Sequence, residues 1–261
     1  MAKYALLLEY NGSEFHGWQI QTNTRTVQGT LEYALAKFAN EPIQTITAGR
    51  TDTGVHALNQ VIHFSSNANR DLYGWVKGVN ANLPASIRIK QVALVSDEFD
   101  ARFSALSRTY HYYLLTQSFS SSLLNGLIGW YHKELDLFAM QEAVKLLVGR
   151  KDFSSFRAAN CQANSPVRDM IAAEIEKTGN IFRFKFTANA FLYHMVRNIV
   201  GALVYVGIGR ISISDFQVLL DEQNRTKAPP TFMADGLYLA HIAYPEKVFE
   251  MSEPESWLFN L

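Results

Sequence analysis

The sequence predicts an α/β (α+β) protein made of two successive units, each with the order strand, helix, strand, strand, helix, strand. Two observations predict this class. Short apolar or alternating runs, typical of strands, are separated by segments in which apolar residues recur at helical spacing, and this order of elements occurs twice. It is the split β-α-β-β-α-β order of ferredoxin-like or RRM-like units. Two such units side by side would form one extended mixed, largely antiparallel sheet with a central cleft.

The first unit is expected within the first hundred residues. Its strands are predicted at residues 3–10, 43–48, 58–65 and 86–95. A helix is predicted from Val27 to residue 39, because apolar residues recur there at every third or fourth position. A second helix is predicted at 71–83, where Asp71 can act as the N-cap and Pro84 stops the helix.

The second unit repeats this order. Its strands are predicted at residues 107–115, 170–178, 181–188 and 236–244. One helix is expected from Asp136 to about Leu147 and another from Tyr193 to Ile208. An extra helix at 213–222 and a loop with two prolines interrupt this unit. Because no residue-level repeat relates the halves, the duplication is inferred from element order alone.

Composition fits a globular protein with a large core, since 48% of the 261 residues are hydrophobic and 18% are charged. This length allows one large domain or two smaller ones. We expect an N-terminal subdomain at 1–105, a C-terminal subdomain at 106–245 and an acidic tail at 246–261.

Cellular location is suggested by three features. Cys161 is the only cysteine, which excludes an intrachain disulfide or a cysteine-built zinc site and suits a reducing cytoplasm. The apolar run at the amino terminus is too short for a signal peptide. The longest apolar region, 191–209, contains His194, Arg197 and Asn198, which are costly in a bilayer. We therefore predict a cytoplasmic protein that does not enter membranes, with 191–209 as a buried helix.

Charge is balanced overall, with 24 basic and 24 acidic residues, so no strongly basic nucleic-acid binder is indicated. The distribution is uneven, however. Residues 145–197 contain nine Lys and Arg against four acids, whereas the tail from 246 contains one lysine and four glutamates. This pattern fits either a phosphate-binding face or an ordinary solvated surface.

The stretch AGRTDTGVH at 48–56 places one carboxylate, Asp52, in a loop between two predicted strands. Ordinary turn chemistry would explain this, because Asp accepts bonds from nearby backbone N–H groups and Gly54 can take a positive φ. Asp-Thr-Gly also occurs in aspartic proteases, but that mechanism needs a second carboxylate, and the sequence holds no second copy. Arg50 would moreover keep Asp52 ionised.

Arg197 is a second candidate, because it lies on a mostly apolar helix and must reach water or a carboxylate. If the helix is buried, Arg197 could pair with Asp52 and lower the pKa of that carboxyl. The alternative is an arginine that snorkels to the surface. His194 lies one turn earlier, and Gly201 one turn later leaves room for close approach.

Five segments resemble the tRNA pseudouridine synthase A family in the family's order, from about residue 4 to residue 244. They are EYNGSEFHGWQIQ, AGRTDTGVHA, FDARFSALSRTYHYY, DFSSFRAANCQANSPVR and FLYHMVRNIVGALVYVG. The resemblance implies an isomerase without cofactor or metal that converts uridine to pseudouridine in the anticodon stem-loop of tRNA, at positions 38–40. It also implies a homodimer in which one tRNA touches both chains.

The resemblance also implies roles for three residues. Asp52 corresponds to the family's nucleophile, Tyr110 to the tyrosine that stacks on the target uracil, and Arg197 to the ion-pair partner of the aspartate. The chemistry agrees, since moving a C–N bond without net redox needs no cofactor, and no nucleotide or metal motif is present. The sequence does not decide whether the carboxylate attacks the sugar C1′, attacks the uracil ring or promotes a glycal.

Other residues near these motifs are candidate RNA contacts. Substrate binding is assigned to Tyr110, Arg50, Arg102 and His194, and Arg108, Arg157 and Arg168 are further candidate phosphate contacts. His16 and Trp18 either border an RNA groove or pack within a loop. Asp100 stands where family members often carry a histidine, which puts an RNA contact there in doubt.

A different class of function stays open. A non-catalytic RNA-binding module built from RRM-like units would also fit the element order. Such a module would bind tRNA without Asp52 and never yield pseudouridine. The absence of an RNP1 string such as K-G-F-G-F-V-x-F counts against this alternative.

Overall fold

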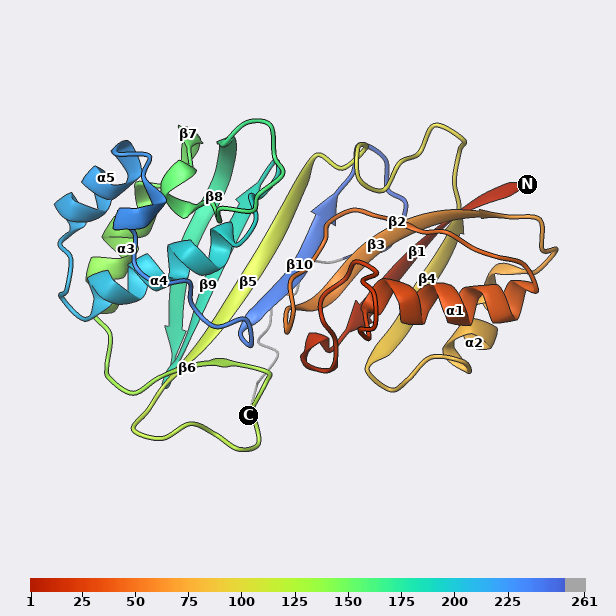
Figure 1. Ribbon diagram of the computed structural model, residues 1–261, viewed down its shortest axis with the longest axis horizontal. Coiled ribbons are helices and arrows are strands. Elements are labelled where there is room, and N and C mark those ends of the chain that lie inside the picture. Colours follow the sequence, from red (N-terminus) through yellow and green to blue (C-terminus); the bar gives the residue numbers. More distant parts are fainter. Residues whose placement is uncertain (252–261) are drawn as a thin grey trace. The chain divides into compact units, whose positions relative to one another are not determined.

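The computed structural model describes residues 1–251, and their contacts divide the chain into two compact units (Figure 1). The first unit comprises residues 1–106 together with 238–251, and the second comprises Ser107–Leu237. Ten strands and five α-helices occur among the described residues. The predicted mixed, largely antiparallel α/β class is therefore confirmed.

The first unit contains a mixed sheet with the order β4-β1-β3. Its strands are β1 (Ala2–Tyr10), β2 (Ile46–Thr47), β3 (His56–Ser66), β4 (Ile87–Leu94) and β10 (Leu237–Ala243). β1 pairs antiparallel with β3 and β4, and β2 pairs antiparallel with the middle of β3. β10 runs parallel to β3, with Tyr238 opposite His56.

Two helices pack on this sheet, α1 (Val27–Ala39) and α2 (Leu72–Asn80). The side chains of Thr26 and Asp71 cap their N-termini by accepting backbone N–H groups. Trp75 of α2 is fully buried against the rings of Tyr4 and Phe64, with centroids 5.3 and 5.1 Å away. This aromatic cluster joins α2 to β1 and β3. A short 3-10 helix, η1 (Gly12–Glu14), follows β1.

The second unit has the strand order β5-β9-β8-β7, and β6 pairs parallel with β5. Its strands are β5 (Ser107–Thr116), β6 (Gly129–Tyr131), β7 (Gly149–Asp152), β8 (Val167–Thr178) and β9 (Ile181–Ala188). Every second residue of β9 is buried, including Phe182, Phe184 and Phe186. Phe153 and Phe156 are also fully buried.

The helices of this unit are α3 (Leu137–Lys145), α4 (Met195–Gly207) and α5 (Ile213–Asp221), with short 3-10 helices η2 (Ser154–Phe156) and η3 (Arg225–Lys227). Eleven of the 13 residues of α4 are buried. The prediction of a buried helix in the longest apolar region is confirmed. No helix among residues 1–251 is long and apolar enough to cross a bilayer.

The structure adds detail that the sequence pattern does not contain. β6 and β7 are absent from the predicted elements, because strands of three and four residues are too short to show a period. Of the strand expected at 43–48, only Ile46 and Thr47 form a strand, β2. β10, which the expected subdomains assign to the second half, groups with the first unit from Tyr238 onward. Most of the expected tail at 246–261, with Trp257, Leu258 and Phe259, lies outside the described residues.

Replacement of Trp75 by Ala tests the aromatic core of the first unit. Trp75 has no exposed surface, so we expect Trp75→Ala to lower the free energy of unfolding in urea by about 3–5 kcal/mol. Tyr73→Ala, on the same helix, is the control. Tyr73 is 71% exposed, and its loss should change stability by less than about 0.5 kcal/mol. Equal effects of the two substitutions would contradict this description.

Candidate active site

The loop with Asp52 leaves β2 and enters β3, and backbone bonds fix both ends. The Ala48 amide donates to the Val61 carbonyl at 2.9 Å, and the Val55 amide closes a turn by donating to the Asp52 carbonyl at 3.1 Å. Gly54 has φ +79°, as the turn prediction requires. Asp52 is half-buried at this turn. Asp52 therefore combines a turn conformation with partial exposure.

A buried polar network supports this loop from below. The hydroxyls of Tyr10 and Thr51 lie 2.8 Å apart. The Gln60 side-chain amide donates to the Gly49 carbonyl at 2.7 Å and to the Tyr10 hydroxyl at 3.4 Å. Burial raises the pKa of Tyr10 to about 12, against hydrogen bonds with Thr51 and Gln60 that lower it, and the charge of Asp52 adds to the increase. Tyr10 is therefore a neutral hydrogen-bonding support for the loop near Asp52.

The segment 12–18 packs directly on the same loop. The Trp18 amide donates to the Thr51 carbonyl at 2.9 Å, and the Gly54 amide donates to the Phe15 carbonyl at 3.4 Å. Gly17 has φ +81°, and a Cβ there would lie 2.7 Å from the Thr51 carbonyl oxygen. Two motifs that are separate in the sequence thus form one structure.

The side chains of this segment divide between core and surface. Trp18 is 1% exposed and lies beside Tyr10, with ring centroids 6.0 Å apart. It therefore packs within the loop, which is the second of the two alternatives posed for it. His16 is exposed. The ring of His56 is buried and accepts the Gly12 amide on Nδ1 at 3.0 Å.

Tyr110 lies on β5 of the second unit, opposite Phe186 of β9. Residues alternate across a strand, so Tyr110 and Tyr112 share one face while His111 and Tyr113 share the other. The Tyr110 ring meets that of Phe191 edge-to-face at 4.9 Å and is 8% exposed. Its position is therefore set on the face that also carries the buried phenylalanines of β9.

Arg197 lies in the first turn of α4 and is half-buried. Its Nε donates to the Phe232 carbonyl at 2.8 Å, while the Phe232 amide donates to the Arg197 carbonyl at 3.2 Å. Gly201 permits this close approach, because a Cβ there would lie 2.5 Å from the Pro230 carbonyl oxygen. The room that the sequence predicts at Gly201 is thus taken by backbone.

His194 is the N-cap of α4 and has a left-handed backbone, with φ 60° and ψ 6°. A residue with a Cβ bears a cost of about 1–2 kcal/mol in this region. Its ring stacks on that of Tyr193 with centroids 4.0 Å apart. The substrate-binding role predicted for His194 stays a prediction.

The predicted RNA contacts in the first unit are on its surface. Arg50 is exposed in the loop with Asp52. Arg102 is also exposed, and its guanidinium lies over the Phe103 ring at 5.2 Å. The Asp100 carboxylate accepts the amides of Arg102 and Phe103 at 2.8 and 2.9 Å. Asp100 therefore shapes the turn that presents Arg102.

The further basic candidates in the second unit bond to backbone. Arg157 donates to the carbonyls of Cys161 and Ala163 at 2.8 and 2.7 Å. Arg168 donates to the Ser165 carbonyl at 2.8 Å. These guanidinium groups organise the loop between η2 and β8, a role that the sequence analysis did not predict.

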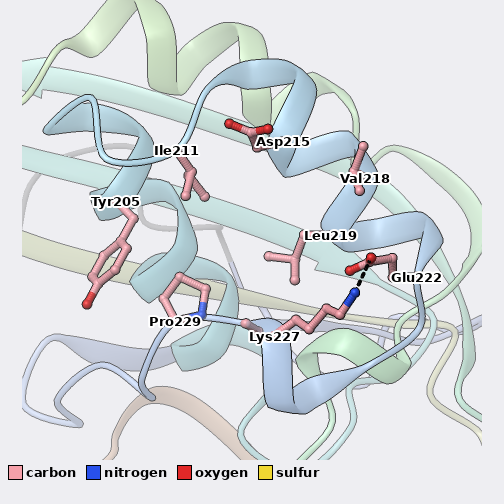
Figure 2. A pocket seen from close by; sticks show the side chains of 9 residues that line it. Tyr205, Ile211, Asp215, Val218, Leu219, Glu222, Lys227 and Pro229 are labelled. Atoms are coloured by element: carbon pink, nitrogen blue, oxygen red, sulfur yellow. Dashed lines mark hydrogen bonds and ion pairs between the residues drawn. The ribbon is translucent and has the colours of Figure 1, made fainter.

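A shallow groove of about 330 Å³ lies elsewhere in the second unit, between the end of α4, α5 and η3 (Figure 2). It contains none of the predicted site residues. Its rim carries the ion pair of Lys227 and Glu222. The lining residues are Tyr205, Ile211, Asp215, Val218, Leu219, Glu222, Lys227, Ala228 and Pro229. Among residues 1–251, no group of three or more His, Cys, Asp or Glu side chains is placed to hold a metal ion.

The structure thus places Asp52, Arg50 and Arg102 in the first unit and Tyr110, His194 and Arg197 in the second. Sequence reasoning missed the polar side chains that support them. Gln60 and Asn198 are fully buried amides. A polar amide inside a segment that is predicted to be a strand or a buried helix is the signal that could have drawn attention to them.

Comparison with known proteins gives consistent matches. The sequence profile of the tRNA pseudouridine synthase family matches residues 7–104 and 143–245. A tRNA pseudouridine synthase A of Chromobacterium violaceum is 53% identical over 94% of each chain. The protein of the same name from Neisseria meningitidis serogroup B is 51% identical over 94% of this chain and 92% of its own.

More distant proteins also match. A tRNA pseudouridine synthase A of Paraburkholderia phytofirmans is 46% identical over 98% of this chain and 94% of its own. Among solved structures, a Cbf5-Nop10-Gar1 complex is 10% identical with a TM-score of 0.33, over 90% of this chain and 57% of the other.

Alanine at Gly17 tests how the segment 12–18 is fitted to the loop. Gly17→Ala introduces strain of about 1–2 kcal/mol and also displaces the Thr51 carbonyl. Gly209→Ala is the matched control, because Gly209 has φ +70° with open space around it. We expect the first substitution to lower the free energy of unfolding clearly more than the second. A larger loss at Gly209 would refute the fit described for Gly17.

The buried hydroxyl of Tyr10 predicts a pH dependence. Its folded-state pKa of about 12 lies above the unfolded value of about 10. Its contribution to stability is thus complete below pH 10 and is lost as the pH rises through 12. Between about pH 9 and pH 11, the wild type should lose about 1 kcal/mol more unfolding free energy than Tyr10→Phe. Parallel urea-denaturation profiles for the two proteins would disprove the buried, neutral tyrosine.

Proposed function

We propose that this chain, which belongs to the tRNA pseudouridine synthase family, isomerises uridine to pseudouridine in the anticodon stem-loop of tRNA with Asp52 as its nucleophile. Isomerisation of uridine in tRNA follows from the family and from relatives about half identical to this chain over most of its length. Beyond this reaction, we propose that the target uridines lie at positions 38–40 of the anticodon stem-loop and that Asp52 is the nucleophile.

The observation that carries the assignment of Asp52 is the construction of its loop. The half-buried residue Asp52 lies in a turn that is held by the Tyr10, Thr51 and Gln60 network below and by the segment 12–18 beside it. A catalytic group has to be held in one geometry before the substrate arrives. This degree of support exceeds what an ordinary surface turn needs.

The chemistry asks for such a carboxylate. The bond between uracil N1 and ribose C1′ breaks, and a bond between C5 and C1′ forms. The C5 hydrogen leaves as a proton and N1 gains a proton, so no electron is gained or lost overall. Asp52 can add to C1′ or to the ring, or promote a glycal intermediate, and each route needs the charged form of the carboxyl.

The second unit supplies the remaining groups in this proposal. Tyr110 stacks on the extruded uracil, which offsets part of the few kcal/mol needed to unstack it. Arg197 pairs with Asp52 and keeps it ionised. His194, Arg50 and Arg102 contact the RNA, and Arg50 and Arg102 are exposed.

The family resemblance also supports a homodimer in the cytoplasm, with one tRNA touching both protomers. A non-catalytic RRM-like module is the weaker alternative, because the relatives that match nearly the whole chain carry the name of an enzyme. An aspartic protease is weaker still, since the sequence has one Asp-Thr-Gly and no second copy.

Replacement of Asp52 by Asn is the direct test of the nucleophile. Asn is nearly isosteric but neutral, so Asp52→Asn should reduce tritium release from tRNA labelled at uridine C5 by at least about 10³-fold. Binding of tRNA should be retained. Asp71→Asn is the control, because Asp71 is an exposed helix cap and Asn caps about as well.

Two outcomes would end parts of this proposal. Near-wild-type release by Asp52→Asn would remove Asp52 as the nucleophile, and absence of release by the wild type would favour a binding module. Mass-shift mapping of pseudouridine in tRNA from a deletion strain then locates the product. If the deletion strain lost pseudouridine only at positions outside the anticodon stem-loop, this result would contradict the proposed position.

A further inference from the structure

A five-residue segment at 228–232, here called the strap, crosses the first turns of α4. Its Phe232 carbonyl accepts Nε of Arg197, and its Phe232 amide donates to the Arg197 carbonyl. Its Pro230 carbonyl lies where a Cβ of Gly201 would stand. The strap therefore makes two hydrogen bonds to Arg197, to which the proposed function gives a catalytic role.

The strap is held in turn by one guanidinium. Arg225 donates from Nη1 to the carbonyls of Ala228 and Pro229, at 3.1 and 3.0 Å. It donates from Nη2 to Oγ1 of Thr231 and to Oδ1 of Asn198, both at 3.1 Å. One planar side chain thus bridges the beginning of the strap, its Thr231 side chain and α4.

Arg225 has an unusual electrostatic position. These four acceptors are neutral oxygens, and no ion pair involves Arg225 among residues 1–251. Burial lowers the pKa of its guanidinium. A partly buried cation without a carboxylate costs free energy unless its hydrogen bonds are made. The planar arrangement of donors in the Arg225 guanidinium, more than its charge, therefore explains its place here.

Asn198 completes the connection on the helix. It is fully buried and follows Arg197 directly in α4. Its Nδ2 donates to the Phe156 carbonyl at 2.8 Å, which leaves Oδ1 to accept both Arg225 and the Thr231 hydroxyl, the latter at 2.6 Å. Arg225, Asn198 and Thr231 therefore form a closed triangle of hydrogen bonds one residue away from Arg197.

We propose that Arg225 and Thr231 are positioning residues, which lock the strap onto Asn198 so that the Phe232 carbonyl fixes the guanidinium of Arg197 for catalysis. This inference rests on the proposed function, because it takes Arg197 to act on Asp52. With Nε engaged by Phe232, the plane of the guanidinium is set and the terminal nitrogens point in one direction. Misplacement by about 1 Å can cost about 100-fold in rate.

The paired substitutions Thr231→Val and Thr231→Ser test the triangle with little change in volume. Val removes the hydroxyl that donates to Asn198 and accepts from Arg225, whereas Ser keeps it. We expect Thr231→Val to lower kcat for tritium release by about tenfold or more, with KM for tRNA changed by less than about threefold. Thr231→Ser should restore kcat to near the wild-type value.

Arg225→Lys is the second variant, since an ammonium keeps the charge but lacks the planar fork that reaches four acceptors. It should lower kcat in the same way as Thr231→Val. The matched control is Arg210→Lys, because Arg210 is exposed and its guanidinium donates to the Tyr205 hydroxyl and lies over the Tyr205 ring, away from Arg197. Its kcat should stay at the wild-type value.

A double-mutant cycle with Arg197→Lys separates positioning from a general loss of stability. If Arg225 acts through Arg197, adding Arg225→Lys to Arg197→Lys should lower kcat by no more than about twofold further. Independent effects would multiply in full, and this result would overturn the inference. Wild-type kcat in folded Thr231→Val and Arg225→Lys would also overturn it. The proposed function fails separately, if Asp52→Asn keeps its activity.

Discussion

The hydrogen bond from the Trp18 amide to the Thr51 carbonyl is the contact on which the geometry around Asp52 depends. It joins the segment after β1 to the loop before β3, and it forms only because Gly17 adopts a positive φ and has no Cβ to meet that carbonyl. The Tyr10 hydroxyl reaches the side chain of the same threonine. Thr51 is thus held through both its backbone and its side chain, and Asp52 follows it directly in the chain.

The two units support the side chains proposed for catalysis in the same physical way. In each, a fully buried side-chain amide donates to a backbone carbonyl of a neighbouring segment. Gln60 of β3 donates to Gly49, and Asn198 of α4 donates to Phe156. A buried amide left without partners would cost about 1–3 kcal/mol. The segments that carry Gly49 and Phe156 must therefore lie where their carbonyls can accept these hydrogen bonds. These bonds also restrict the positions of Asp52, which follows Gly49 in the same loop, and of Arg197, which precedes Asn198.

The sequence predicts most of this fold because its strong periods belong to the large elements. The spacing of Val27, Leu31 and Leu35 predicts α1 with the bounds that the structure has. The family strings likewise select Asp52, Tyr110 and Arg197 as a set. The residues that support them cannot be predicted in this way. Arg225 and Thr231 make hydrogen bonds between segments that no local sequence pattern connects. The pairing of β10 with β3 is equally non-local.

That pairing has a consequence for how the chain comes to be folded during synthesis. The first unit begins at the amino terminus but takes its last strand from beyond Leu237, so the whole second unit is inserted within it. A ribosome adds about 5–20 residues per second. The edge of β3 that receives β10 therefore waits on the order of ten seconds for its partner. During that interval the unpaired edge of β3 can pair with strands of other chains. A chaperone that covers this edge would prevent such pairing.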